Sequence, residues 1–310
     1  MEKELRKLVD LLDLEEIEQN HYRGKGPTEG WQRVYGGQVL GQALVAASRT
    51  VGRDIGRPKP GNGDPDGTQE PDRLAHSLHA YFLRPGDPQV PILYVVDRIR
   101  DGRSFTTRRV VAIQHGRPIF NMSISFQVME EGLSHQTDMP DVPPPEELEN
   151  EMDIRRRHAE AAGADTETES FYTRYRPMDM RPIPGAHGER NDFAPDKRAP
   201  LQMCWIKTSD RLPEDVRIHQ CALAYLSDWS LLDTCTYPHG VSFMDPKMQV
   251  ASLDHAMWFH RAFRADEWLL YVQDSPSSSG GRGFNRGLIY RRDGVLAASV
   301  AQEGLIRMWE

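Results

Sequence analysis

The sequence is poor in cysteine and contains no long hydrophobic run. Its three cysteines lie too far apart for a C-x-x-C motif, so neither a zinc site nor a disulfide framework is expected. No window approaches the roughly 18 apolar residues that a membrane helix needs. The N-terminal residues alternate acids and bases and have no apolar signal-peptide core. We therefore expect a cytoplasmic protein without metal, cofactor or membrane association.

An excess of positive charge is also absent. The chain has 38 Lys and Arg against 46 Asp and Glu, a net charge of −8, which argues against a nucleic-acid-binding protein. The G-x-S-x-G pentapeptide of serine hydrolases is missing too. The sequence therefore argues against a serine hydrolase of that kind.

The 310 residues predict two globular domains rather than one, and the second half repeats the first. Four pairs of landmarks lie 177–179 residues apart: Phe82 and Phe259, Gln42 and Gln220, Gly116 and Gly294, and Arg103 and Arg282. Such a constant offset indicates an internal duplication. We expect one domain over residues 1–130, a linker rich in proline and charge over 131–200, and a second domain over 201–310.

Each copy contains an apolar helix followed by antiparallel strands. The helices are expected at 38–48 and 216–226, and both are apolar on nearly every face, which is typical of buried helices. The strands are expected at 75–83, 91–100, 104–114 and 118–128, and again at 248–259, 267–274, 283–291 and 295–306. An α+β double hotdog is predicted, in which each antiparallel sheet wraps around its helix.

Other segments carry weaker patterns. Leucines at helical spacing predict a helix over 3–18, and Gly, Pro and Asp predict a solvated loop over 53–73. A further helix is expected near 146–162, inside the linker.

Several segments together resemble the acyl-CoA thioesterase II family along nearly the whole chain. They are Val34-Tyr-Gly-Gly-Gln-Val-Leu-Gly-Gln-Ala, His79-Ala-Tyr-Phe-Leu-Arg-Pro-Gly, Asp101-Gly-Arg-Ser-Phe, Asp254-His-Ala-Met-Trp-Phe-His-Arg, Glu267-Trp-Leu-Leu-Tyr, Arg282-Gly-Phe-Asn-Arg-Gly and Gln302-Glu-Gly. The resemblance implies a double hotdog fold, hydrolysis of fatty acyl-CoA to fatty acid and CoA, and a homodimer or homotetramer.

The resemblance also implies a catalytic trio, which falls on Asp228, Ser252 and Gln302. The bacterial pattern has threonine where this chain has Ser252, so the hydroxyl is kept and the β-branch is lost. Asp228 would take a proton from a water that the other two side chains hold. Direct attack by Asp228, through a mixed anhydride, stays open. No carboxylate stands at the matching first-half position near Ala47–Thr50, so one active site per chain is expected, with a degenerate first domain.

Arginines on two predicted hairpins, Arg103, Arg282 and Arg286, are candidates for binding the CoA phosphates, although such side chains more often form surface ion pairs. Asp254 and His255 resemble an acid–base pair. Neighbouring residues of a strand point to opposite faces, so a structural role is expected for both.

Two other functions compete with the thioesterase. A hotdog enoyl-CoA hydratase would need a histidine shortly after its aspartate, and none follows Asp228 at that spacing. A non-catalytic acyl-CoA binding protein would not need the trio.

Overall fold

The computed structural model describes residues 8–26, 33–51, 73–165, 168, 176–185 and 188–309. The loop predicted over 53–73 lies outside these residues except for its last position, which begins a strand.

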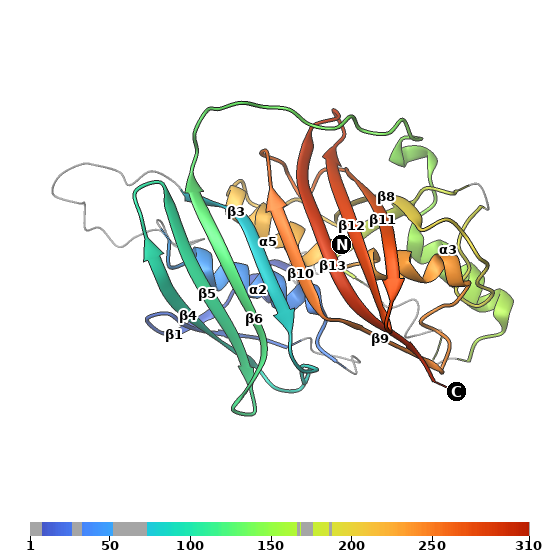
Figure 1. The fold of residues 1–310 in the computed structure, drawn as a ribbon, viewed down its shortest axis with the longest axis horizontal. Helices are drawn as coiled ribbons and strands as arrows, with labels where there is room; N and C mark the ends of the chain where they lie inside the picture. The colour runs from blue at the N-terminus through green and yellow to red at the C-terminus, as the bar shows by residue number, and fades with distance from the viewer. Residues whose placement is uncertain are drawn as a thin grey trace.

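The chain folds as a double hotdog around one continuous 13-stranded antiparallel sheet (Figure 1). The described part of the first half contributes six strands, in the spatial order β1 (Glu15–Glu18), β2 (His21–Gly24), β4 (Ile92–Asp101), β5 (Phe105–Gln114), β6 (Arg117–Val128) and β3 (Arg73–Phe82). The second half continues with β10 (Asp254–Phe259), β13 (Leu296–Met308), β12 (Arg282–Arg291), β11 (Leu269–Ser279), β8 (Leu201–Thr208) and β7 (Met178–Pro182), while β9 (Met248–Ser252) pairs with β13 outside this path.

The register of the two central strands reveals a pseudo-twofold axis. His79 of β3 pairs with Ala256 of β10, and the two residues are 177 positions apart. Their neighbours pair symmetrically, Leu78 with Met257 and Ala80 with His255. Leu78 and His255 are thus equivalent positions, and the geometry reproduces the repeat offset seen in the sequence.

Two central helices lie against the concave face of the sheet and against each other (Figure 1). Every residue of α2 (Gly36–Ser48) after Gly36 is buried, as are the last nine residues of α5 (Val216–Ser227). A Cβ atom on Gly41 would lie 3.0 Å from the carbonyl oxygen of Cys221. Glycine at this position therefore allows the two helices to approach closely.

Three sequence predictions need correction. The helix predicted over 3–18 is wrong in its second part, because residues 8–12 are helical but β1 follows as an exposed edge strand. The strand predicted over 248–259 is broken at Leu253 into β9 and β10. The predicted linker helix starts later, as α3 (Glu151–Ala162), after the short 3₁₀ helix η1 (Pro145–Glu147).

The segment predicted as a linker packs on the second half. Its long extended part crosses over one end of the sheet toward η1 and α3 (Figure 1). A small apolar cluster around Trp205 is covered by four side chains of this segment, Met139, Val142, Leu148 and Ile183. Strand β7 of the same segment pairs with β8. The boundaries at 130 and 200 stay a prediction. Among the described residues, we find no helix with the length and apolarity that a membrane crossing requires.

Candidate active site

Three elements of the second half bring the predicted trio together. Asp228 is the residue that ends α5, Ser252 is the last residue of β9, and Gln302 lies in β13. Because β9 pairs with β13, with Ser252 opposite Gly304, the hydroxyl and the amide approach the end of the helix from the sheet.

The three side chains are within direct contact of one another. Gln302 Nε2 donates to Asp228 Oδ1 at 2.7 Å and to Ser252 Oγ at 2.9 Å. Ser252 Oγ lies 3.5 Å from the same carboxylate oxygen. The Asp228 side chain is only 6% exposed, and Gln302 is fully buried. The arrangement is therefore a compact polar cluster in an apolar surrounding.

Burial raises the pKa of Asp228 above its ordinary value. Hydrogen bonds from Gln302, the backbone N–H of Gly37 and Ser252 act in the opposite direction and favour the carboxylate. Burial makes this carboxyl group a stronger base than an exposed aspartate, and the hydrogen bonds favour its ionised form, which is the form that general base catalysis needs.

Gln302 also presents an acceptor. With its Nε2 committed to Asp228 and Ser252, its Oε1 is buried and finds no hydrogen-bond partner among the described residues. Buried polar atoms are nearly always paired in folded proteins. This oxygen therefore points to a ligand with a hydrogen to donate.

The first half contributes the N-terminus of α2 to the same site. A Cβ atom on Gly36 would lie 2.7 Å from Asp228 Oδ2 and 3.0 Å from the Phe82 ring. The positive end of a helix stabilises negative charge. The carboxylate of one half thus sits directly on the helix start of the other.

His255, for which the sequence predicted a structural role, faces the site. Its Nδ1 lies 3.9 Å from Asp228 Oδ1 and its Nε2 lies 3.0 Å from Ser227 Oγ. Burial lowers the pKa of His255 to about 3, so the ring is neutral. Strand alternation does separate it from Asp254, whose carboxylate accepts from the Glu303 N–H at 2.7 Å. The same alternation turns His255 inward, toward Asp228.

The predicted phosphate-binding arginines lie away from the trio. Arg282 Nε contacts Glu303 Oε1 at 3.0 Å and Arg286 Nε contacts Asp274 Oδ1 at 2.9 Å. Both are exposed and leave the sheet on the face opposite to Asn285, the cross-strand partner of Gln302.

Arg103 lies elsewhere, where its carbonyl accepts from Arg73 at the far end of β3. The three arginines are thus not brought together, and their role in binding CoA stays a prediction.

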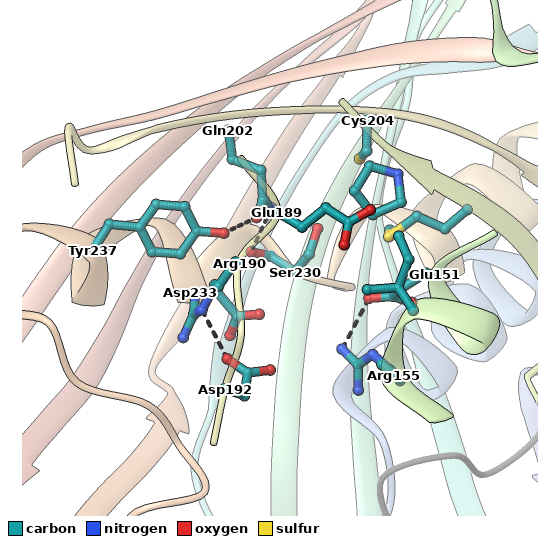
Figure 2. A pocket seen from close by; sticks show the side chains of 13 residues that line it. Glu151, Arg155, Glu189, Arg190, Asp192, Gln202, Cys204, Ser230, Asp233 and Tyr237 are labelled. Atoms are coloured by element: carbon teal, nitrogen blue, oxygen red, sulfur yellow. Dashed lines mark hydrogen bonds and ion pairs between the residues drawn. The ribbon is translucent and has the colours of Figure 1, made fainter. Parts of the chain in front are cut away.

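A second polar pocket lies between α3, the linker and the second half, lined by Asp233, Arg190, Glu151, Arg155 and their neighbours (Figure 2). Burial raises the pKa of Asp233 to about 6. Arg190 pairs with Asp192 at 2.7 Å, so these charges largely compensate one another. No member of the trio lines this pocket.

Other catalytic chemistries find little support in the described residues. No group of His, Cys, Asp and Glu side chains there could hold a metal ion. Cys204, Cys221 and Cys235 are buried, and burial raises the pKa of each thiol, that of Cys235 to about 11. None of them is an activated nucleophile.

The equivalent place in the first half is filled. Ile124 occupies the position of Gln302, and its cross-strand partner Arg108 that of Asn285. The buried Arg108 guanidinium donates to Thr50 Oγ1 at 2.8 Å and to the Thr50 carbonyl at 3.2 Å, at the C-terminal end of α2. An arginine thus occupies the place where a second trio would stand.

Comparisons with known proteins agree along the chain. The family model described as acyl-CoA thioesterase matches residues 178–305, and that of the acyl-CoA thioesterase N-terminal domain matches 26–127. Acyl-CoA thioesterase 2 of Haemophilus influenzae is 39% identical over 99% of both chains. Acyl-coenzyme A thioesterase 8 of Mus musculus is 39% identical over 97% of this chain and 89% of its own length. The crystal structure of the acyl-CoA thioesterase II TesB2 from Mycobacterium marinum, 42% identical, covers 99% of each chain with a TM-score of 0.73.

Proposed function

This chain belongs to the acyl-CoA thioesterase II family and is a thioester hydrolase, and from that premise we propose that Asp228, Ser252 and Gln302 activate water to hydrolyse fatty acyl-CoA. The observation that supports this assignment is the convergence of the three side chains within 2.7–3.5 Å in a buried setting. The substrate enters as a fatty acyl thioester of CoA and leaves as a fatty acid and free CoA.

The orientation of the cluster suggests the position of the water. Gln302 Oε1 accepts one hydrogen of the water, and Asp228 accepts the other. The Ser252 hydroxyl receives its hydrogen bond from Gln302 and can donate to the water or the carboxylate. Gln302 and Asp228 thereby each accept one hydrogen of a single water, and Ser252 lies beside them with a hydrogen to donate.

The reaction then follows in two steps. Asp228 takes a proton from the water while the water oxygen attacks the carbonyl carbon of the thioester. The N-terminus of α2 favours the negative charge that develops nearby. The tetrahedral intermediate collapses, the C–S bond breaks, and the proton on Asp228 passes to the departing thiolate. Asp228 is again a carboxylate, so one water is consumed per thioester.

Direct attack by Asp228 is the second route. Its carboxylate would displace the thiolate, and water would cleave the mixed anhydride. Single-turnover hydrolysis in H₂¹⁸O tests this route, because ¹⁸O enters Asp228 only if water attacks the Asp228 carbon of such an anhydride, and labelled Asp228 would therefore establish direct attack. We favour the water route because Asp228 Oδ1 is already held by Gln302, which lowers its nucleophilicity.

The test is Asp228→Asn, which keeps the shape and removes the base. We expect kcat for acyl-CoA to fall by about three orders of magnitude, followed as release of free thiol. Circular dichroism and thermal unfolding should remain close to those of the wild type. Near-normal turnover by the folded variant would remove the base assignment. Thiol release by the wild type also separates the enzyme from a hydratase or a binding protein, since neither produces thiol.

A further inference from the structure

A cationic hollow lies next to the C-terminal end of β3, where the chain continues as a loop. It is lined by Arg84, Pro85, Gln114, His115, Arg117 and Ile119. No carboxylate belongs to this lining, two of its members, Gln114 and Ile119, are buried, and Ile119 belongs to the apolar core that includes α2. The hollow therefore opens at the end of the same layer that contains the catalytic trio.

The charge of the hollow is not neutralised within the described part of the chain. His115 is paired with Asp87 at 2.9 Å, and that carboxylate also accepts from the Gln89 N–H. Arg84 uses one nitrogen for the Pro118 carbonyl at 2.6 Å. Neither Arg84 nor Arg117 has an ion pair among the described residues, so two positive charges face the solvent together.

The hollow is held in place by its own hydrogen bonds. The backbone N–H groups of Leu83 and Arg84 both donate to the Ile119 carbonyl, at 2.8 and 3.1 Å. The Gln114 side-chain amide accepts a hydrogen bond from the Asp87 N–H and donates one to the Asp87 carbonyl, each at 2.8 Å. The loop that carries Arg84 is thus ordered before any ligand arrives, which lowers the entropic cost of binding.

A direct structural path leads from the hollow to the trio. The Phe82 N–H donates to the carbonyl of Leu253, the residue after Ser252, at 2.9 Å, and the Phe82 ring lies beside Gly36. Arg84 is two residues further along, which is at most ~7 Å of extended chain. The same loop is tied to the entrance of α2 because the Val34 N–H donates to the Gly86 carbonyl at 3.0 Å.

We propose that this hollow binds the phosphates at the nucleotide end of the acyl-CoA substrate. The inference rests on the proposed function, since it assumes a thioester bound at Asp228. The pantetheine arm would then run past Phe82, and the guanidinium groups of Arg84 and Arg117 would receive the phosphate oxygens. Guanidinium is suited to this task because its planar fork matches two oxygens at once.

The test compares two thioesters that differ only in the nucleotide. The double variant Arg84→Gln/Arg117→Gln is assayed with an acyl-CoA and with the N-acetylcysteamine thioester of the same acid. We expect KM for acyl-CoA to rise by about tenfold or more with kcat little changed, and both constants for the truncated thioester to stay at their wild-type values. Rising salt should increase the wild-type KM for acyl-CoA and affect the variant less.

A control variant removes the same charge elsewhere. Arg156→Gln/Arg211→Gln neutralises two exposed, ion-paired arginines and should leave both substrates unaffected. Unchanged KM for acyl-CoA in the Arg84/Arg117 variant would overturn the inference, as would an equal loss with both thioesters. Failure of the wild type to hydrolyse either thioester would instead refute the proposed function.

Discussion

At the scale of single residues, Ser252 links the amide and the carboxylate of the trio. It accepts from Gln302 Nε2 at 2.9 Å and lies 3.5 Å from Asp228. We expect Ser252→Ala to lower kcat by about 10- to 100-fold, the usual value of a hydrogen bond to a charged group. Ser252→Thr restores the hydroxyl and should remain within a few-fold of the wild type. Equal activity of both variants, measured as thiol release, would show that the hydroxyl is not used.

His255 allows a test of how Asp228 is tuned. We expect His255→Leu to fold, because Leu78 occupies the equivalent position in the first half. An apolar neighbour makes ionisation of Asp228 harder and raises its pKa further. Since the reaction needs the carboxylate, the acid limb of the kcat/KM profile should move to higher pH, by up to about one unit.

The matched control for this substitution is His260→Leu. His260 contacts Ser299 Oγ at 2.8 Å at an exposed position, away from Asp228. Removing this imidazole should leave the acid limb of the kcat/KM profile at its wild-type pH. An acid limb that does not move in His255→Leu would show that His255 has only a packing role.

The trio was identified in the sequence only through the family resemblance. Nothing in the local pattern around Asp228 distinguishes it from a solvated residue at the end of a helix, because its burial depends on α2 from the other half. His255 was given only a structural role for a related reason. Alternation predicted that it faces away from Asp254 but not that its own face contains the site.

At the scale of elements, the N-terminus of α2 requires glycine for contact with Asp228. Gly36→Ala would place a methyl group 2.7 Å from Asp228 Oδ2. Alanine favours the helix by about 1 kcal/mol over glycine, so the helix itself is not weakened and the carboxylate must move. We expect kcat to fall at least tenfold, with little change in thermal unfolding. Gly132→Ala, where the methyl group meets open space, should leave kcat unchanged.

Elements were predictable where their pattern reflects burial on all sides, as in α2. The prediction failed at β1, where leucine spacing suggested a helix up to Ile17. That side chain is 52% exposed, and pairing with β2, Glu15 opposite Arg23, decides the structure. Tertiary pairing of an edge strand leaves no periodic signal in so short a segment.

At the scale of the whole molecule, the two duplicated halves differ in side chains at equivalent places. The second half keeps a buried amide at Gln302, with an acceptor atom that lacks a partner among the described residues. The first half has Ile124 there and the hydrogen-bonded Arg108 beside it. An active site with unsatisfied groups costs stability, whereas a filled site contributes to it. The missing carboxylate near Ala47–Thr50 predicted a degenerate first half, which stays a prediction, and the burial of Arg108 could not be recognised from sequence alone.

This contrast predicts different outcomes for two substitutions, one in each of the two equivalent places: Gln302 in the second half, and Arg108, the cross-strand partner of Ile124, in the first. Gln302→Ile installs the first-half residue in the proposed active site and should abolish thiol release, because it removes the donor to Asp228 and Ser252. Arg108→Met keeps an unbranched apolar stem but removes the guanidinium group and leaves the Thr50 carbonyl without its partner. It should lower stability by about 2–3 kcal/mol and leave kcat nearly unchanged. Because the two sites are related by the pseudo-twofold axis, each variant serves as the other's control. Loss of activity in folded Arg108→Met would mean that the first half contains a second working site, and the assignment of one active site per chain would then be wrong.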